Sequence, residues 1–320
     1  MITKNTLFIL GAGSSVPFGY PTGDQLTRKI AFEFKDPFIE FMNKKRGSDY
    51  SKRDYIIGQS EILVNTLRRT NLTIDSFLSI NPDLSEIGKM AIFFIISLAE
   101  KHSTLPWEGS TYSPDWYKPL IRNMIESLPE KNRLSHLLDN KISFITFNYD
   151  RLLEFMLFQN LKNIFRTTDE SYIIEQLINI PVVHIYGKIA NLPWQDKQGL
   201  PYKYDFDFDN VYNFKHNIYT IGEKNYSENI NYAHELIKKA ERLIFLGFGF
   251  SKDNLKILKL PNILDGKQEI IGTALTFSQT KINKLITFFS RHTEPGKGGV
   301  DLGHVKIFDK NCNYVLNDLL

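Results

Sequence analysis

Near its start, the sequence carries an apolar run of strand length, residues 6–10, that ends in the glycine turn Gly11-Ala12-Gly13. The run does not alternate between apolar and polar residues, which is typical of a strand covered on both faces in a parallel sheet. Glycines directly after such a strand let the backbone approach a ligand closely. The feature therefore predicts an α/β fold in which a loop follows the buried first strand at one edge of a parallel sheet.

Further runs of strand length occur later in the chain, and helical patterns separate them; they span residues 142–147, 181–186, 242–246, 269–274 and 304–308. Strands that alternate with helices imply a parallel, doubly wound sheet. Residues 25–140 instead show helical spacing, as at Leu26, Ile30 and Phe34, without a convincing strand. We predict one α/β domain over residues 1–320, a Rossmann-like doubly wound parallel sheet with a large helical insertion at about 25–140.

Composition excludes several classes of function. The net charge of +3, from 39 basic and 36 acidic residues, gives no overall excess of positive charge of the kind that binds nucleic acid. No direct nucleic-acid binding is therefore expected. The single cysteine, Cys312, permits neither a disulfide within the chain nor a cysteine zinc site, and no metal is expected. The longest apolar run, residues 90–98, is shorter than the about 20 residues that span a bilayer. With no signal peptide at the N-terminus, we expect a cytoplasmic protein without a membrane segment.

The glycine turn and the serines after it, residues 11–15, form the first candidate site. Exposed N–H groups of such a turn, with the N-terminus of the next helix, favour the negative charge of a pyrophosphate. Val16 replaces the third glycine of the usual dinucleotide pattern, and the region about 20 residues further on, where a dehydrogenase places an acidic residue, is helical. A plain dehydrogenase is therefore disfavoured, and a purely structural glycine turn stays as the alternative.

Polar residues follow the next two strand runs. Asn148 and Asp150 come directly after residues 142–147, where both are poor strand formers. Asp150 could simply cap a helix over residues 151–159, but one cap suffices and Asn148 then stays unexplained. His184 and Tyr186 are predicted to share one strand face before Gly187. A lone histidine is more often structural, but its place at a strand end favours a site.

The fourth candidate loop follows residues 242–246 and contains Gly247, Gly249 and Ser251. These residue types again permit a close approach of the backbone to a ligand. The alternative is an ordinary strand–helix loop in which Asp253 caps the helix.

Taken together, these stretches resemble the sirtuin-like family, and specifically its bacterial NAD-consuming antiphage branch. Residues 11–15 (Gly-Ala-Gly-Ser-Ser) are similar to its Gly-Ala-Gly-x-Ser motif, and residues 146–150 (Thr-Phe-Asn-Tyr-Asp) to its Thr-x-Asn-x-Asp motif. A His-Gly strand end and a Gly-x-Ser loop follow in the same order, and the latter is similar to residues 249–251. Residues 21–23 (Pro-Thr-Gly) and 73–77 (Thr-Ile-Asp-Ser-Phe) resemble segments of the bacterial branch. The first two motifs are fairly specific in combination, and the others are looser.

The resemblance implies hydrolysis of NAD to nicotinamide and ADP-ribose. It implies Asn148 and His184 as the catalytic residues, with Asp150 as a helper and His184 as general base near neutral pH. The residues expected to hold NAD are Gly11, Ala12, Gly13, Ser14, Ser15, Thr22, Asp75, Tyr186, Gly187, Gly247, Gly249 and Ser251.

Two departures from the family bear on this expectation. The four zinc-binding cysteines of the deacetylase sirtuins are missing, which favours hydrolysis over protein deacylation. Tyr186 stands where the family's histidine usually precedes the glycine, and His184 lies two residues earlier.

The resemblance also implies a regulated antiphage effector that forms homo-oligomers, with a HerA-type ATPase as a candidate partner. Two alternatives stay open: a non-catalytic sensor of NAD or an ADP-ribose derivative, which the residue Tyr186 favours, and a protein ADP-ribosyl transferase.

Overall fold

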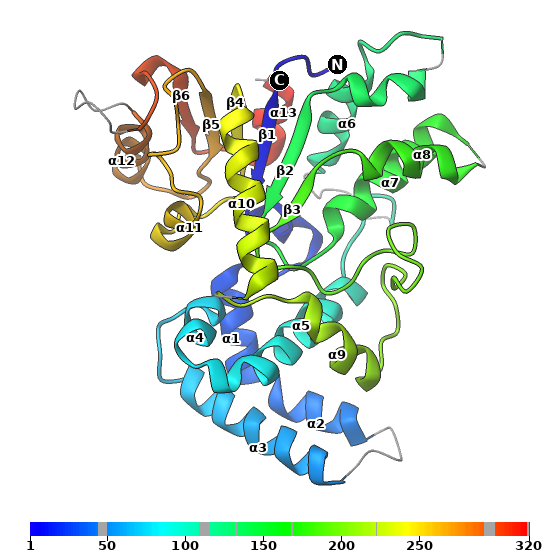
Figure 1. Ribbon diagram of the computed structural model, residues 1–320, viewed down its shortest axis with the longest axis vertical. Helices are drawn as coiled ribbons and strands as arrows, with labels where there is room; N and C mark the ends of the chain where they lie inside the picture. Colours follow the sequence, from blue (N-terminus) through cyan, green and yellow to red (C-terminus); the bar gives the residue numbers. More distant parts are fainter. Residues whose placement is uncertain are drawn as a thin grey trace.

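The structure is a computed structural model that describes residues 1–43, 50–108, 115–131, 133–167, 169–221, 223–290, 298–318 and 320. Its centre is a six-stranded parallel sheet in the order β3-β2-β1-β4-β5-β6 (Figure 1). The strands are β1 (Thr6–Leu10), β2 (Ile142–Thr146), β3 (Val182–His184), β4 (Arg242–Leu246), β5 (Glu269–Thr273) and β6 (Val305–Phe308). This arrangement confirms the predicted α/β, Rossmann-like doubly wound parallel sheet.

Helices cover both faces of the sheet, as its buried central strands require. Every residue of β1 and β2 is buried. Helix α6 contacts both α7 and α13, so these three form one layer, whereas α10 crosses in front of the sheet and packs on β3 (Figure 1). The helices of the sheet region are α6 (Tyr117–Ile125), α7 (Leu152–Phe165), α8 (Glu170–Ile178), α10 (Lys224–Lys239), α11 (Lys252–Ile257), α12 (Gln279–Phe289) and α13 (Cys312–Asp318).

Among the described residues between β1 and β2, none lies in a strand, and helices joined by short loops make up this stretch. They form α1 (Gly23–Glu33), α2 (Lys35–Asn43), α3 (Tyr50–Leu67), α4 (Ile74–Ile80), α5 (Ser85–Lys101) and then α6. Helices α1–α5 build a lobe beside the sheet, and α9 (Phe208–Phe214) joins it against α5 (Figure 1). Phenylalanines fill this lobe: Phe94 contacts the rings of Phe34, Phe38 and Phe206.

The third strand is shorter than its apolar run. The sequence predicts a strand over residues 181–186, but β3 ends at His184 and the chain turns at Ile185 and Tyr186. The N–H of Gly187 donates to the carbonyl oxygen of His184 at 3.1 Å, which closes the turn. Gly187 has φ +71°, a conformation that glycine adopts without strain. The prediction that His184 and Tyr186 share one strand face is therefore wrong.

Candidate functional site

The loops after β1, β2, β3 and β4 meet at the carboxyl edge of the sheet. The chain leaves β1 toward β2 and later enters β4 on the opposite side, so the strand order reverses between β1 and β4. Ligands of doubly wound folds bind in the crevice at such a switch point. Backbone bonds fasten the loops to one another there: Gly11 N–H donates to Leu246 at 3.1 Å, and Phe147 N–H to Leu10 at 3.1 Å. The fold thus brings the four predicted loops together.

The glycines of the first and fourth loops pack against each other. Gly13 N–H donates to the carbonyl oxygen of Gly247 at 3.0 Å. A Cβ on Gly11 or on Gly13 would lie 2.7 Å from that same oxygen. Gly247 has φ +57°, and a Cβ there would lie 2.0 Å from the amide nitrogen of Ser14. Packing of the two loops against each other therefore already requires these three glycines, and no bound ligand is needed to explain them.

The amides of the first loop are largely occupied. Gly11, Gly13, Ser14 and Ser15 each donate their N–H to a carbonyl oxygen of the protein. Helix α1 begins only at Gly23, after two 3₁₀ turns. The expectation that this loop offers a row of exposed N–H groups beside a helix N-terminus is therefore wrong, because β4 and the 3₁₀ turns already accept these bonds.

Asn148 and the serines of the first loop form a buried polar cluster. The side-chain Nδ2 of Asn148 donates to Ser15 Oγ at 3.1 Å and to Ser14 Oγ at 3.4 Å. Its backbone N–H donates to Thr146 Oγ1 at 3.0 Å. Asn148 is 7% exposed, yet its Oδ1 has no hydrogen-bond partner among the described residues. A buried acceptor without a donor is costly, and native proteins usually satisfy such atoms.

Asp150 adjoins this cluster and has a perturbed acidity. Burial raises the pKa of its carboxyl to about 6, although hydrogen bonds from Leu152 N–H and from Ser15 oppose the shift. The bond from Leu152 N–H to Asp150 Oδ1 is 3.1 Å, at the first residue of α7. Asp150 therefore supports the start of α7, as the alternative interpretation predicts. A carboxyl with this pKa can also exchange protons near neutral pH.

His184 is held on both sides of its ring. Nδ1 lies 3.1 Å from the carbonyl oxygen of Asn148 and must donate to it, because a carbonyl only accepts. Nε2 lies 2.9 Å from Glu154 Oε1, which also accepts from Lys188 Nζ at 2.6 Å. Burial opposes the charge of Glu154, but Lys188 and His184 hold the pKa of that carboxyl well below its usual range. Neither ring nitrogen of His184 is left for a water or a substrate.

Glu154 and Lys188 were not found by sequence reasoning. Glu154 stands in the first turn of α7 between apolar residues, and an acid within an otherwise apolar helix is the signal that points to it. Its second carboxyl oxygen, Oε2, is buried and has no partner among the described residues.

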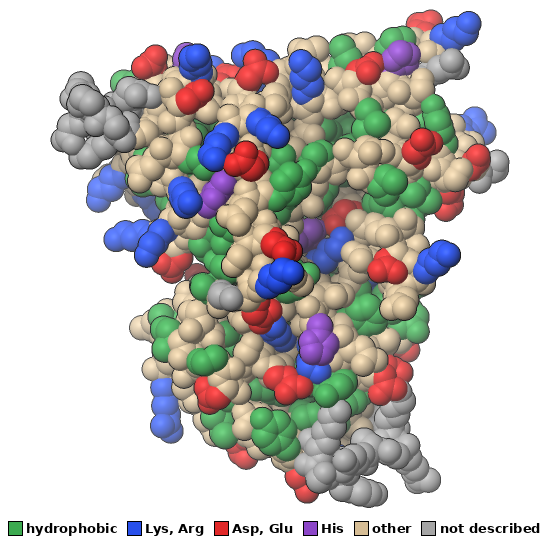
Figure 2. Space-filling view, in the orientation of Figure 1, with side chains coloured by type: hydrophobic (Ala, Val, Ile, Leu, Met, Phe, Trp, Pro, Cys, Tyr) green, Lys and Arg blue, Asp and Glu red, His purple; other side chains and the backbone are tan. Residues whose placement is uncertain are grey.

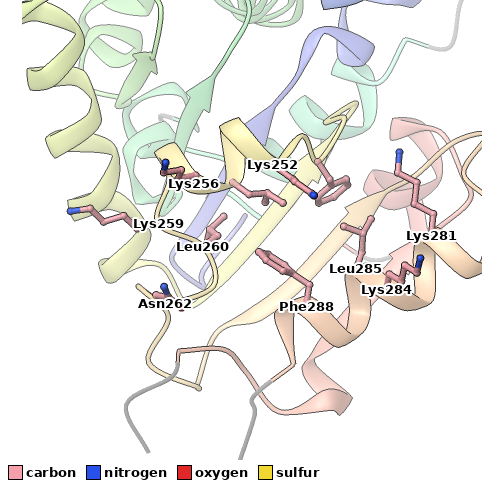
Figure 3. Close-up of a pocket in the computed structure, with 11 residues that line it drawn as sticks. Lys252, Lys256, Lys259, Leu260, Asn262, Lys281, Lys284, Leu285 and Phe288 are labelled. Atoms are coloured by element: carbon pink, nitrogen blue, oxygen red, sulfur yellow. The ribbon is translucent and has the colours of Figure 1, made fainter. Parts of the chain in front are cut away.

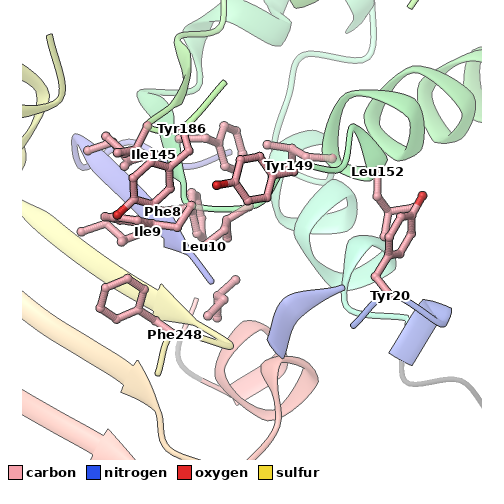
Figure 4. Packing of buried hydrophobic residues seen from close by; sticks show 14 of the residues in the cluster. Phe8, Ile9, Leu10, Tyr20, Ile145, Tyr149, Leu152, Tyr186 and Phe248 are labelled. Atoms are coloured by element: carbon pink, nitrogen blue, oxygen red, sulfur yellow. The ribbon is translucent and has the colours of Figure 1, made fainter. Parts of the chain in front are cut away.

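The aromatic residues on either side of Asn148 in the chain pack around the ring of Tyr186. The ring of Tyr186 lies 6.0 Å from Tyr149, 5.9 Å from Phe147 and 5.8 Å from Tyr226, measured between centroids. Figure 4 shows Tyr149 and Tyr186 beside the ends of the central strands, with Phe248 on the β4 side. Burial raises the pKa of Tyr186, which therefore keeps its proton.

Asp75 reaches this aromatic cluster from the helical lobe. It lies in the first turn of α4 and accepts a hydrogen bond from the hydroxyl of Tyr149. Burial raises the pKa of Asp75, and the bond from Tyr149 opposes that shift. The sequence-based choice of Asp75 thus identifies a residue that joins the lobe to the β2–α7 loop.

A buried ion pair makes a second connection between lobe and site. Arg151 Nε lies 2.9 Å from Glu100 Oε2, and its second terminal nitrogen lies 2.6 Å from Glu100 Oε1. The two side chains are 2% and 3% exposed. The guanidinium also donates to carbonyl oxygens of Asn191, Leu200 and Pro201. The residue next to Asp150 is therefore fixed to α5 and to the loop that follows β3.

The remaining predicted residues have local structural roles. Thr22 caps α1 in a reciprocal bond pair with Gln25. Ser251, rather than Asp253, caps α11 by accepting from Asn254 N–H at 3.2 Å. A Cβ on Gly187 would lie 1.8 Å from the carbonyl oxygen of Asn217, so contact with that residue requires this glycine. Gly249 differs from these, because nothing lies within 4 Å of its would-be Cβ.

The three catalytic candidates are almost fully enclosed: Asn148 and Asp150 are each 7% exposed and His184 is 8% exposed. A cavity between α11 and α12 is lined by none of the predicted site residues. Among the described residues, no group of histidine, cysteine or acidic side chains is arranged to hold a metal ion. None of the described helices has the length and apolarity needed to cross a bilayer.

No family model matches the chain. No curated protein matches it either.

Proposed function

We propose that this chain binds NAD at the carboxyl ends of β1, β2 and β4 and hydrolyses the bond between nicotinamide and ribose. The observation that carries the proposal is the unpaired Oδ1 of Asn148, a buried acceptor on a side chain whose Nδ2 is held by Ser14 and Ser15. A ribose hydroxyl or a water would supply the missing donor. The resemblance of residues 146–150 to the sirtuin-like motif supports the same residue.

In this proposal Asp150 is the general base. The glycosidic bond between C1′ of the ribose and the nicotinamide nitrogen breaks through an oxocarbenium-like state, and nicotinamide leaves with the bonding electrons. The oxygen of a water bonds to C1′, and its proton passes to the carboxylate of Asp150. A carboxyl whose pKa is about 6 is suited to this transfer, because it is largely ionised at neutral pH and still basic.

We assign His184 a positioning role in place of the base role that the sequence suggested. Its Nδ1–H holds the backbone carbonyl of Asn148, and Glu154 with Lys188 fixes the ring from the other side. The rings of Tyr149 and Tyr186 offer apolar surface for the nicotinamide or the adenine.

Enclosure of the three polar residues supports regulation, because NAD must displace neighbouring groups to reach them. In this proposal, assembly into homo-oligomers or contact with a HerA-type ATPase opens the site, as an antiphage effector needs. The same enclosure favours the second candidate, a sensor that binds NAD or an ADP-ribose derivative without cleavage.

The test is nicotinamide release from NAD by the full chain, alone and with a HerA-type ATPase. We expect release by the wild type and its loss in Asn148→Ala and Asp150→Asn. Asn179→Ala and Asp139→Asn are matched controls, because both side chains are exposed and lie outside the cluster. NAD binding without release under both conditions would support the sensor, and transfer of label from NAD to protein would support an ADP-ribosyl transferase.

A further inference from the structure

A cavity of about 800 Å³ lies between α11 and α12, away from the proposed NAD site. Its volume falls within the range of about 300–1,000 Å³ that small-molecule pockets occupy. Five buried or half-buried apolar side chains form its floor: Phe250, Leu255, Leu260, Leu285 and Phe288. In Figure 3, Leu260, Leu285 and Phe288 point into the space between the two helices. We call this space the α11–α12 cavity.

Lysines surround this floor. The lining contains Lys252, Lys256, Lys259, Lys281 and Lys284, and within the described residues it contains no acidic side chain. Figure 3 shows Lys252 between the helices, Lys256 and Lys259 on one rim, and Lys281 and Lys284 on the other. Basic side chains also project over this side of the molecule in Figure 2. The whole chain carries a net charge of only +3, so five positive charges on one cavity are a marked local excess.

The cavity lysines lack carboxylate partners among the described residues, whereas lysines elsewhere, such as Lys188 and Lys203, are paired. Lys281 lies 3.4 Å from the ring centre of Phe277, a cation–π contact that leaves its charge uncompensated. Like charges around one opening repel each other, and a multiply charged anion removes that repulsion. Lysine stems are flexible, so ammonium groups at the rim can turn toward a bound anion.

From this arrangement we infer that the α11–α12 cavity binds an amphipathic anion, with an apolar chain or ring on the floor and a phosphate-bearing head at the lysine rim. Inorganic phosphate alone matches only the rim, because the floor offers carbon surface and no buried donor. A neutral apolar molecule matches only the floor. The presence of both halves in one cavity favours a single ligand that carries both.

A ligand in this cavity would contact the β4–α11 loop through Phe250. That residue stands between Gly249 and Ser251 and has φ +50°, which is uncommon for a side chain of this size. Its ring lies 5.2 Å from that of Phe248, whose ring lies 5.4 Å from that of Phe147, the residue before Asn148. The binding inference does not depend on NAD cleavage, and its test uses no NAD.

The test is displacement of the fluorescent anion anilinonaphthalene sulfonate from the full chain by decyl phosphate, decanol or inorganic phosphate. We expect decyl phosphate to displace the dye at least tenfold more effectively than either other compound. Added salt should weaken the displacement, because salt screens exposed charges. In Lys252→Gln/Lys284→Gln, the affinity for decyl phosphate should fall by about tenfold, the scale of two exposed ionic contacts.

The control is Lys141→Gln/Lys197→Gln, which removes the same charge from exposed positions outside the cavity and should bind decyl phosphate as the wild type does. All four substitutions lie on exposed side chains, so folding is preserved, and circular dichroism checks it. Equal weakening in both double variants would overturn the inference. So would displacement by decanol as effective as that by decyl phosphate, or no displacement by decyl phosphate at all.

Discussion

Replacement of Glu100 by Gln would leave the guanidinium of Arg151 buried without its carboxylate. Both side chains are at most 3% exposed, so solvent does not screen the lost charge. Two nitrogen–oxygen contacts, of 2.9 and 2.6 Å, join the pair, and an amide can replace only one of them, because its NH₂ group faces a second donor. Breaking a buried pair from one side costs about 3–5 kcal/mol, so we expect Glu100→Gln to lower the free energy of unfolding by that amount.

Urea unfolding followed by fluorescence measures this loss. With a slope of about 3 kcal/mol per molar urea, the midpoint should fall by about 1 M or more. Glu33→Gln is the matched control, because Glu33 pairs with Lys29 at 2.9 Å on an exposed helix face, and its loss should cost less than about 1 kcal/mol. Replacing both partners by apolar residues, Glu100→Leu with Arg151→Met, should recover part of the stability. Equal midpoints for Glu100→Gln and Glu33→Gln would refute the reasoning.

Three other predictions concern the glycines after β4, Asp150 and Cys312. Gly247→Ala should destabilise the protein by about 3 kcal/mol or more in urea unfolding, since φ is +57° and the added Cβ meets Ser14, whereas Gly249→Ala should stay within about 1 kcal/mol of the wild type. Because folding raises the pKa of Asp150 to about 6, its carboxyl stabilises the protein at low pH and loses that contribution as pH rises through 6; Asp150→Asn should therefore gain stability over the wild type at pH 8 and not at pH 4. Burial raises the pKa of Cys312 to about 12, so its thiol should react with a disulfide reagent at pH 8 only after unfolding.

The strands were predictable from the sequence because their apolar runs and glycine stops are local signals. The runs at residues 6–10 and 242–246 match β1 and β4 at both ends. The run at residues 181–186 predicted a strand that is too long. Ile185 and Tyr186 lie in a turn but are buried by tertiary packing, so their apolar side chains resemble those of a strand.

The site was predictable only in part. Asn148 and Asp150 stand out as polar residues after a buried strand, and the structure places them in one cluster with Ser15. The packing contact that requires glycine at positions 11 and 13 could not be predicted, because the backbone they contact belongs to Gly247, far along the chain. The hydrogen bond at Nε2 of His184 also could not be predicted, because its partner Glu154 lies 30 residues away in the sequence and no local pattern connects the two.

The most direct test of the proposed function is nicotinamide release from NAD by the wild type and by Asn148→Ala, compared at equal concentration with and without an added HerA-type ATPase. We expect release by the wild type and by Asn179→Ala, and none by Asn148→Ala, with circular dichroism showing that all three proteins are folded. Full release by a folded Asn148→Ala protein would contradict the account, because the unpaired Oδ1 would then have no part in the reaction.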